Sequence, residues 1–233
     1  MNHKGKFVLS STWRTFVGAA ALCLAASMPV QAAVVTFEDV PPNLTAFGES
    51  LSSGGYKFTD DNVGGFIGID SAAAFAAAPA NSAGQFLYML NAAGVIMTSE
   101  AGSGFFLSSF DVAFISPIPG LAGALPGRLA VDLYDLSGVY FATEFFDLPS
   151  GAAGGDFPFE SLSLTNTAAL SQAYFYSCSF QPDGNCEFFG QSPPAQFALD
   201  NISNAVVPEP GTAVLALTAF GLIVIRRRPI ARA

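Results

Sequence analysis

Short runs of apolar and β-branched residues, separated by Gly, Pro, Ser or Asn, fill the chain between residues 33 and 207. Runs of this length and composition are typical of strands rather than helices. Within several of them apolar side chains occupy alternate positions, as Leu129, Val131 and Leu133 do around Asp132. Because successive side chains of a strand point to opposite sides, this alternation predicts sheets with one buried face.

About ten such runs follow one another without a sustained helical period, so the expected fold class is all-β. Two sheets packed face to face would bury the many phenylalanines economically, which favours a jelly-roll-like β-sandwich. The alanine-rich segment 71–84 is the exception, and we expect a helical turn or a loop there. Residues 91–94 are expected to close a hairpin between the runs 85–90 and 95–100. One face of a further strand is expected to carry Phe106, Ser108, Phe110, Val112 and Phe114.

Residues 1–32 have the three regions of a secretory signal peptide. Basic residues come first, and the apolar run 16–26 that follows is too short to span a bilayer. Small residues then lead to a cleavage point between Ala32 and Ala33. We therefore expect an N-terminal signal helix that is removed on export, and Ala33 as the first residue of the mature chain.

The C-terminal segment 208–233 has three parts in a fixed order: an acidic Pro-Glu-Pro tripeptide, an apolar run and an arginine cluster. The prolines keep the tripeptide extended and accessible to a processing enzyme. The run 211–225 is shorter than the roughly 20 residues of a comfortable transmembrane helix, although the arginine stems lengthen its usable span. The arginines also hold that end on the cytoplasmic side. The charged and proline positions are Pro208, Glu209, Pro210, Arg226, Arg227 and Arg228.

This tail resembles the PEP-CTERM sorting signal of Gram-negative bacteria, and the resemblance covers about the last 25 residues. It implies that an exosortase, a membrane-embedded transpeptidase-like protease, recognises the tail and removes it near the Pro-Glu-Pro motif. The protein would be anchored briefly in the inner membrane through the short C-terminal helix. It would then be delivered to the cell surface or to the polysaccharide matrix of a biofilm. A permanent membrane anchor is the alternative interpretation.

Without its two ends the chain is a domain of ordinary size, residues 33–207, with a strongly acidic balance. This domain contains two basic residues, Lys57 and Arg128, and seventeen Asp and Glu residues, which gives it a net charge of −15. Such a charge repels phosphate backbones, so nucleic acid is not an expected partner. The sole histidine of the sequence, His3, lies in the signal segment, which argues against histidine-dependent catalysis and histidine-bound zinc. We therefore expect that the protein is not an enzyme.

Two cysteines remain in the exported domain, Cys178 and Cys186. The intervening segment 182–185 has the composition of a tight turn, which lets the chain reverse. In an exported protein this pair predicts a disulfide, with a stabilisation of about 2–3 kcal/mol for so short a loop.

Carboxylates at the two ends of the domain suggest a metal site. Glu38 and Asp39 end the first expected strand, and Asp200 and Asn201 lie on the last. If the terminal strands pair, Glu38, Asp39 and Asp200 can supply oxygen ligands to a structural calcium ion. The stretch around Asp200 also resembles calcium-stapled, carbohydrate-binding-like jelly rolls. The alternative is that Asp200 and Asn201 cap a turn or bond backbone amides.

Aromatic residues gather around the predicted disulfide: Tyr174, Phe175, Tyr176, Phe188 and Phe189. Exposed rings at these positions could stack on sugars, whereas buried ones would simply form core. The leading functional hypothesis is a non-catalytic exported protein associated with extracellular polysaccharide. A selective carbohydrate-binding module is the alternative and requires an aromatic-lined surface. A secreted hydrolase is a third hypothesis, and it requires two carboxylates about 5–10 Å apart in a cleft.

Overall fold

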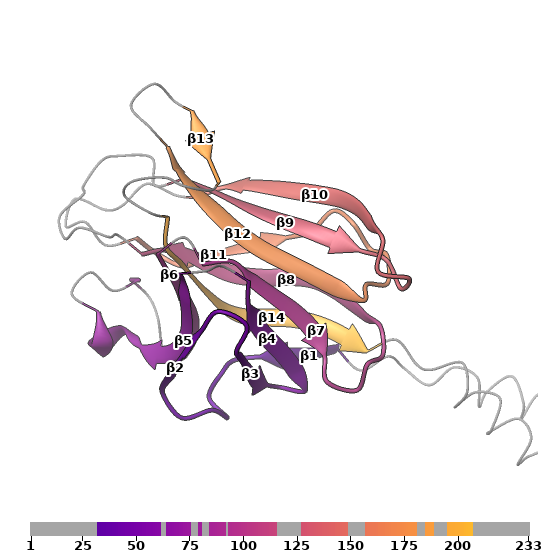
Figure 1. Ribbon diagram of the computed structural model, residues 1–233, viewed down its shortest axis with the longest axis horizontal. Helices are drawn as coiled ribbons and strands as arrows, with labels where there is room; N and C mark the ends of the chain where they lie inside the picture. Colours follow the sequence, from indigo (N-terminus) through magenta and orange to yellow (C-terminus); the bar gives the residue numbers. More distant parts are fainter. Residues whose placement is uncertain are drawn as a thin grey trace, which may run out of the picture. The chain divides into compact units, whose positions relative to one another are not determined.

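Antiparallel strands in two sheets, packed face to face, form the body of the protein, so the expected all-β sandwich is confirmed (Figure 1). The computed structural model describes residues 32–61, 64–75, 79–80, 84–91, 93–115, 127–148, 157–180, 185–188 and 195–206. All of them fall within one compact unit, Gln31–Val207. The Pro-Glu-Pro motif, the arginine cluster and the signal segment before Ala32 lie outside the described residues.

The first sheet contains the first and the last strand of the domain. Its strands are β1 (Ala32–Val35), β2 (Asn43–Ala46), β5 (Phe66–Ser71), β6 (Gln85–Leu90), β8 (Phe105–Phe114), β11 (Glu160–Ser163) and β14 (Phe197–Val206). They follow the order β11-β8-β14-β6-β5-β2, and β1 pairs antiparallel with β14. The terminal strands therefore do pair, which brings the chain segments around Glu38 and Asp200 to the same part of the sheet.

The second sheet is built from the strands between these ends. Its strands are β3 (Ser50–Ser53), β4 (Tyr56–Asp60), β7 (Val95–Ser99), β9 (Arg128–Tyr134), β10 (Tyr140–Asp147), β12 (Gln172–Phe180) and the two-residue β13 (Cys186–Glu187). The order is β10-β9-β12-β7-β4-β3, with β13 paired to the end of β12. The sequence pattern did not indicate β2 and β3, because these short edge strands carry mostly polar side chains.

The core lies between the two sheets and is rich in phenylalanine. Leu129, Val131 and Leu133 of β9 are fully buried, as their alternation predicts. Phe110 and Phe175 come from opposite sheets and meet edge to face, with ring centroids 5.4 Å apart. Each fully buried side chain of this size stabilises the fold by about 2–3 kcal/mol relative to exposure.

The predicted hairpin at residues 91–94 is wrong, because β6 and β7 belong to different sheets. The chain does turn after Leu90, and Asn91 adopts a left-handed conformation with φ 57°. The turn carries the chain across the sandwich instead of back along the same sheet. Leu87 and Val95, which come from the strands on either side of the turn, are both buried in the shared core.

The predicted single face of β8 is also wrong over its first half. Phe110 and Phe114 are buried as expected, but Phe106 is only half-buried, and its neighbours Phe105 and Leu107 are buried in its place. The pairing of β8 with β14 shifts register between these two halves. Such an irregularity moves every later side chain to the other face.

Within the described part of the chain, no helix combines the length and hydrophobicity of a membrane span. A 3₁₀ turn, Ala72–Ala74, lies in the segment where a helical turn or a loop was expected. The signal helix and the short C-terminal transmembrane helix fall outside the described residues and stay predictions.

Candidate functional site

Four aromatic side chains form a row on the outward face of the second sheet. Tyr174 and Tyr176 flank the fully buried Phe175 on β12, and the two tyrosine rings stack with their centroids 4.9 Å apart. Tyr176 meets the edge of Phe188 at 5.0 Å, and Phe188 lies 6.1 Å from Phe145 of β10. We call Tyr174, Tyr176, Phe188 and Phe145 the aromatic strip.

Small residues form the floor on which the aromatic strip lies. Ala130 of β9 pairs with Phe145 on one side and with Tyr176 on the other, and it is fully buried. At Gly94 an added Cβ would come within 2.4 Å of the Tyr174 hydroxyl oxygen. A side chain at Gly94 would therefore displace the Tyr174 ring from its position beside Tyr176.

The disulfide holds one member of the aromatic strip in place. Cys178 and Cys186 are bonded as predicted, with their Cα atoms 5.5 Å apart. The bond ties β13 to the end of β12, where the two strands share a ladder of two residue pairs. Phe188 follows β13 directly, so the disulfide fixes the short strand that presents this ring to Tyr176.

Carboxylates accept hydrogen bonds from both tyrosine hydroxyls. The Tyr176 hydroxyl donates to Oδ1 of Asp132 at 3.2 Å, and the Thr143 hydroxyl donates to the same oxygen. Burial, together with the nearby charge of Asp132, raises the pKa of Tyr176 to about 12. Burial also raises the pKa of Tyr174, and a hydrogen bond to Asp61 adds to that effect. Both hydroxyls therefore stay protonated at neutral pH.

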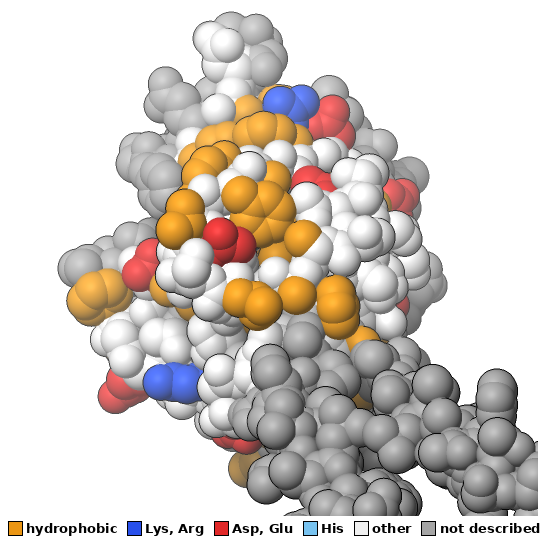
Figure 2. All heavy atoms as spheres, turned by 90° about the vertical axis from the view of Figure 1, so that its right-hand side faces the viewer, with side chains coloured by type: hydrophobic (Ala, Val, Ile, Leu, Met, Phe, Trp, Pro, Cys, Tyr) orange, Lys and Arg blue, Asp and Glu red, His pale blue; other side chains and the backbone are white. Residues whose placement is uncertain are grey.

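The other end of the aromatic strip carries a cation. Arg128 donates to Oδ1 of Asp147 at 2.6 Å, and its guanidinium carbon lies 5.8 Å from the centre of the Phe145 ring. Phe145 is 56% exposed and Tyr140, which belongs to a second aromatic pair with Tyr134, is 52% exposed. Figure 2 shows one face of the molecule, with hydrophobic side chains gathered in its upper half and acidic side chains among and beside them.

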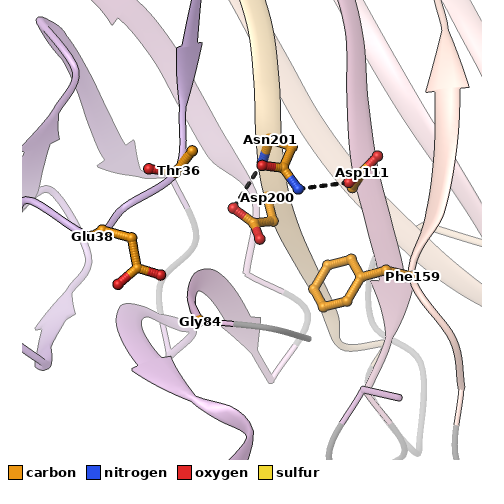
Figure 3. A pocket seen from close by; sticks show the side chains of 7 residues that line it. All are labelled: Thr36, Glu38, Gly84, Asp111, Phe159, Asp200 and Asn201. Atoms are coloured by element: carbon orange, nitrogen blue, oxygen red, sulfur yellow. Dashed lines mark hydrogen bonds between the residues drawn. The ribbon is translucent and has the colours of Figure 1, made fainter. Parts of the chain in front are cut away.

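A pocket of about 270 Å³ opens on the outer side of the first sheet (Figure 3). It is lined by Thr36, Glu38, Gly84, Asp111, Phe159, Asp200 and Asn201. Figure 3 shows the carboxylates of Glu38 and Asp200 directed into this space. We call it the carboxylate pocket.

The structure brings together two of the three residues proposed to bind calcium. Glu38 and Asp200 line the carboxylate pocket, and Asp111 joins them although the sequence did not single it out. Asp39 points elsewhere, because its carboxylate accepts hydrogen bonds from the Gly54 amide and the Ser53 hydroxyl, which lower its pKa. The described residues contain no group of three or more His, Cys, Asp or Glu side chains placed to hold a metal ion. Calcium binding stays a prediction.

Asp200 is the carboxyl group of this pocket whose pKa is raised. Burial raises its pKa to about 6, and the nearby charges of Asp111 and Glu38 act in the same direction. The Asn201 amide donates to Oδ1 of Asp200 at 2.7 Å and opposes the rise only in part. The side-chain amide of Asn201 donates to Oδ2 of Asp111, also at 2.7 Å. Asp200 is thus protonated in a substantial fraction of molecules near pH 6.

Sequence reasoning found part of the aromatic strip and missed the rest. Tyr174, Tyr176 and Phe188 are half-buried, Phe175 is core, and Phe189 lies outside the described residues. The sequence pattern did not single out Phe145, which is on β10, or Asp61, which directly follows β4 of the same sheet. The alternation in β9 did place Asp132 on the face opposite the core, and that was the available signal.

Comparisons with known proteins indicate the fold and no activity. No protein-family model matches the chain, and no curated protein matches it. A DUF4465 family protein from Bacteroides caccae has a similar structure, with a TM-score of 0.51 and 14% identity over 76% of this chain and 100% of that chain. This likeness extends to the sandwich fold alone.

Two further solved structures are more distant. Arabinose-bound MgGH51 α-L-arabinofuranosidase has a TM-score of 0.42 and 14% identity, covering 75% of this chain and 26% of that chain. The tandem CBM22 domains of Paenibacillus barcinonensis Xyn10C have a TM-score of 0.39 and 16% identity, covering 78% and 48%. Both similarities are too low to support a conclusion about this chain.

Proposed function

We propose that this is an exported, non-catalytic protein that binds polysaccharide outside the cell through the aromatic strip of a jelly-roll-like sandwich. The observation that carries the proposal is the continuous row of Tyr174, Tyr176, Phe188 and Phe145 on an outward sheet face. Flat apolar rings match the apolar faces of sugars. Polar groups beside the rings, such as Asp132 and the tyrosine hydroxyls, can bond sugar hydroxyls and fix the orientation of the ligand.

Location supports the same proposal. The signal peptide 1–32 and the PEP-CTERM-like tail 208–233 direct the protein to the surface or matrix of a Gram-negative bacterium, with an exosortase as processing partner. A disulfide is common in exported proteins and rare in the cytosol, and the Cys178–Cys186 bond agrees with export. The ligand at that location would be the host's own extracellular polysaccharide.

Co-sedimentation tests the proposal. Residues 33–207 form a unit with its own core, so they can be purified without the two ends. We expect this unit to pellet with the host's extracellular polysaccharide in millimolar calcium, well above an unrelated acidic protein. A variant with both Tyr174→Ala and Tyr176→Ala should remain in the supernatant. Equal sedimentation of the unit and the unrelated acidic protein would contradict polysaccharide binding.

The carboxylate pocket favours a second candidate, the carboxylate-based secreted hydrolase. A carboxyl group with a raised pKa, such as Asp200, can act as general acid beside a second carboxyl group such as that of Asp111 or Glu38. The test is release of reducing sugar ends from the same polysaccharide near pH 5.5. We expect none above the level of Asp200→Asn. Release by the natural chain that Asp200→Asn abolishes would establish the hydrolase instead.

A further inference from the structure

The two stacked tyrosines have a carboxylate beside each hydroxyl. Asp132 lies beside Tyr176 and is the cross-strand partner of Tyr174, while Asp61 bonds the Tyr174 hydroxyl. Both hydrogen bonds that Asp132 accepts reach Oδ1. Among the described residues none donates a hydrogen bond to Oδ2 of Asp132. Asp61 is exposed.

The two cations of the domain are on β9 and β4, strands that lie on either side of β12. Residues 33–207 contain two, Lys57 and Arg128. Arg128 lies at the Phe145 end of the aromatic strip and is bonded to Asp147. Lys57 is on β4, and β7 separates that strand from β12. With Asp132 and Asp61 beside the two hydroxyls, the tyrosine end of the aromatic strip carries negative groups as well as rings.

From this charge pattern we infer that the ligand is a glycan bearing protonated amines, such as a partly de-N-acetylated hexosamine polymer. The inference rests on the proposed function and names the class of polysaccharide. An ammonium group beside the hydroxyls of Tyr174 and Tyr176 is attracted by the two neighbouring carboxylates. It also forms charge-assisted hydrogen bonds with Asp132 and Asp61.

Other glycans fit the same surface less well. A uronic acid polymer is repelled by the net charge of −15 between residues 33 and 207 and by the two carboxylates at the tyrosine end. A neutral glycan can stack on the rings, but it offers Asp132 and Asp61 only neutral hydroxyls, and hydrogen bonds between neutral donors and carboxylates are weaker than those from a cation.

Matched oligosaccharides test the inference by calorimetric titration of residues 33–207. The probes are hexamers of β-1,4-linked glucosamine and of N-acetylglucosamine, which differ in the charge on nitrogen, and an oligogalacturonide as the acidic case. We expect the glucosamine hexamer to bind at least tenfold more tightly than the N-acetylated one at pH 6, with one ligand per protein. The oligogalacturonide should bind most weakly, and the preference should disappear at alkaline pH, where the amines are neutral.

Single substitutions separate a defined site from general attraction to an acidic protein. Asp132→Asn keeps the shape and the hydrogen-bond acceptor, and it should lower the preference for the amine at least fivefold. Asp61→Asn should act in the same direction. Glu160→Gln removes one negative charge from the first sheet, where Glu160 is exposed, and should leave the preference unchanged.

Three outcomes would overturn the inference. One is equal or tighter binding of the N-acetylated hexamer, and another is a preference that Asp132→Asn and Glu160→Gln reduce alike. The third is that the hexamers do not bind although the protein still sediments with the host's polysaccharide. In each case polysaccharide binding by the aromatic strip is judged separately by the co-sedimentation experiment, so the two proposals fail independently.

Discussion

The two outward faces of this sandwich carry different chemistry on similar backbones. On the second sheet, Tyr174 and Tyr176 lie half-buried beside Asp132, which accepts hydrogen bonds from hydroxyl groups. On the first sheet, Asp200 lies half-buried beside Asp111 and Glu38, with a pKa raised to about 6. One face pairs rings with carboxylates, and the other crowds carboxylates together.

The difference shows where each face could act. Rings with neighbouring hydrogen-bond acceptors favour binding of a ligand with apolar faces and polar edges, as in other ligand sites. Crowded carboxylates instead favour a bound proton or cation, because either one relieves their mutual repulsion. Changes on one face should therefore leave the chemistry of the other unaltered.

Removing the disulfide should have the largest effect and should alter only the second sheet. Replacing both Cys178 and Cys186 by Ser removes a short closed loop, and we expect the free energy of unfolding to fall by about 2–3 kcal/mol in urea titrations. Glycan binding should weaken as well, because Phe188 is no longer held against Tyr176. Reduced natural protein should behave like the variant. Unchanged glycan affinity after reduction would contradict the positioning role of the disulfide.

The pH dependence of stability should report the carboxylate pocket. The pKa of Asp200 is about 6 in the folded protein against an ordinary 3.8, so the folded state binds this proton more tightly. The stabilisation is fully present below about pH 4 and is lost as pH rises through 6. Asp200→Asn should remove that loss and stabilise the protein at pH 7.5 by about 1 kcal/mol, allowing for partial exposure. Urea titrations at pH 5 and pH 7.5 provide the measurement.

Asp39→Asn is the matched control with the opposite sign. Hydrogen bonds from Gly54 and Ser53 lower the pKa of Asp39, so its contribution to stability is present at neutral pH and is lost as pH falls. This variant should be less stable than the natural chain at pH 7.5. If both variants shifted stability in the same direction, the account of the pocket would be wrong.

Calcium should have the smallest effect. If the carboxylate pocket binds calcium, millimolar calcium near the dissociation constant should raise the melting temperature by about 1–2 °C at pH 7.5. Asp200→Ala should abolish the shift, whereas Asp39→Ala should retain it, because Asp39 does not line the pocket. No shift for the natural chain would sink the calcium hypothesis and leave the proton as the relevant cation.

Local patterns in the sequence were enough to predict part of this structure. Alternation in β9 identified its buried face, and a short turn between two cysteines predicted the Cys178–Cys186 bond. Both depend on neighbours within about ten residues along the chain. The pairing of β1 with β14 followed from an assumed sandwich, and it explains why Glu38 and Asp200 share a pocket.

The rest depends on which strands become neighbours, and local patterns do not determine that. Phe145 and Phe188 meet because β10, β9 and β12 are adjacent in one sheet. The predicted turn after Leu90 exists, yet whether a turn returns along one sheet or crosses to another depends on core packing. The register shift between β8 and β14 likewise arises from pairing between distant segments.

Two matched phenylalanines test the central claim most directly. Phe145, in the aromatic strip, is 56% exposed, and Phe47, outside it, is 52% exposed, so neither is needed for the core. Affinity electrophoresis in gels containing the host's polysaccharide would compare Phe145→Ala with Phe47→Ala. We expect Phe145→Ala to weaken retardation about fivefold, a loss of about 1 kcal/mol, and Phe47→Ala to migrate like the natural chain. Equal retardation of the two variants would contradict binding at the aromatic strip.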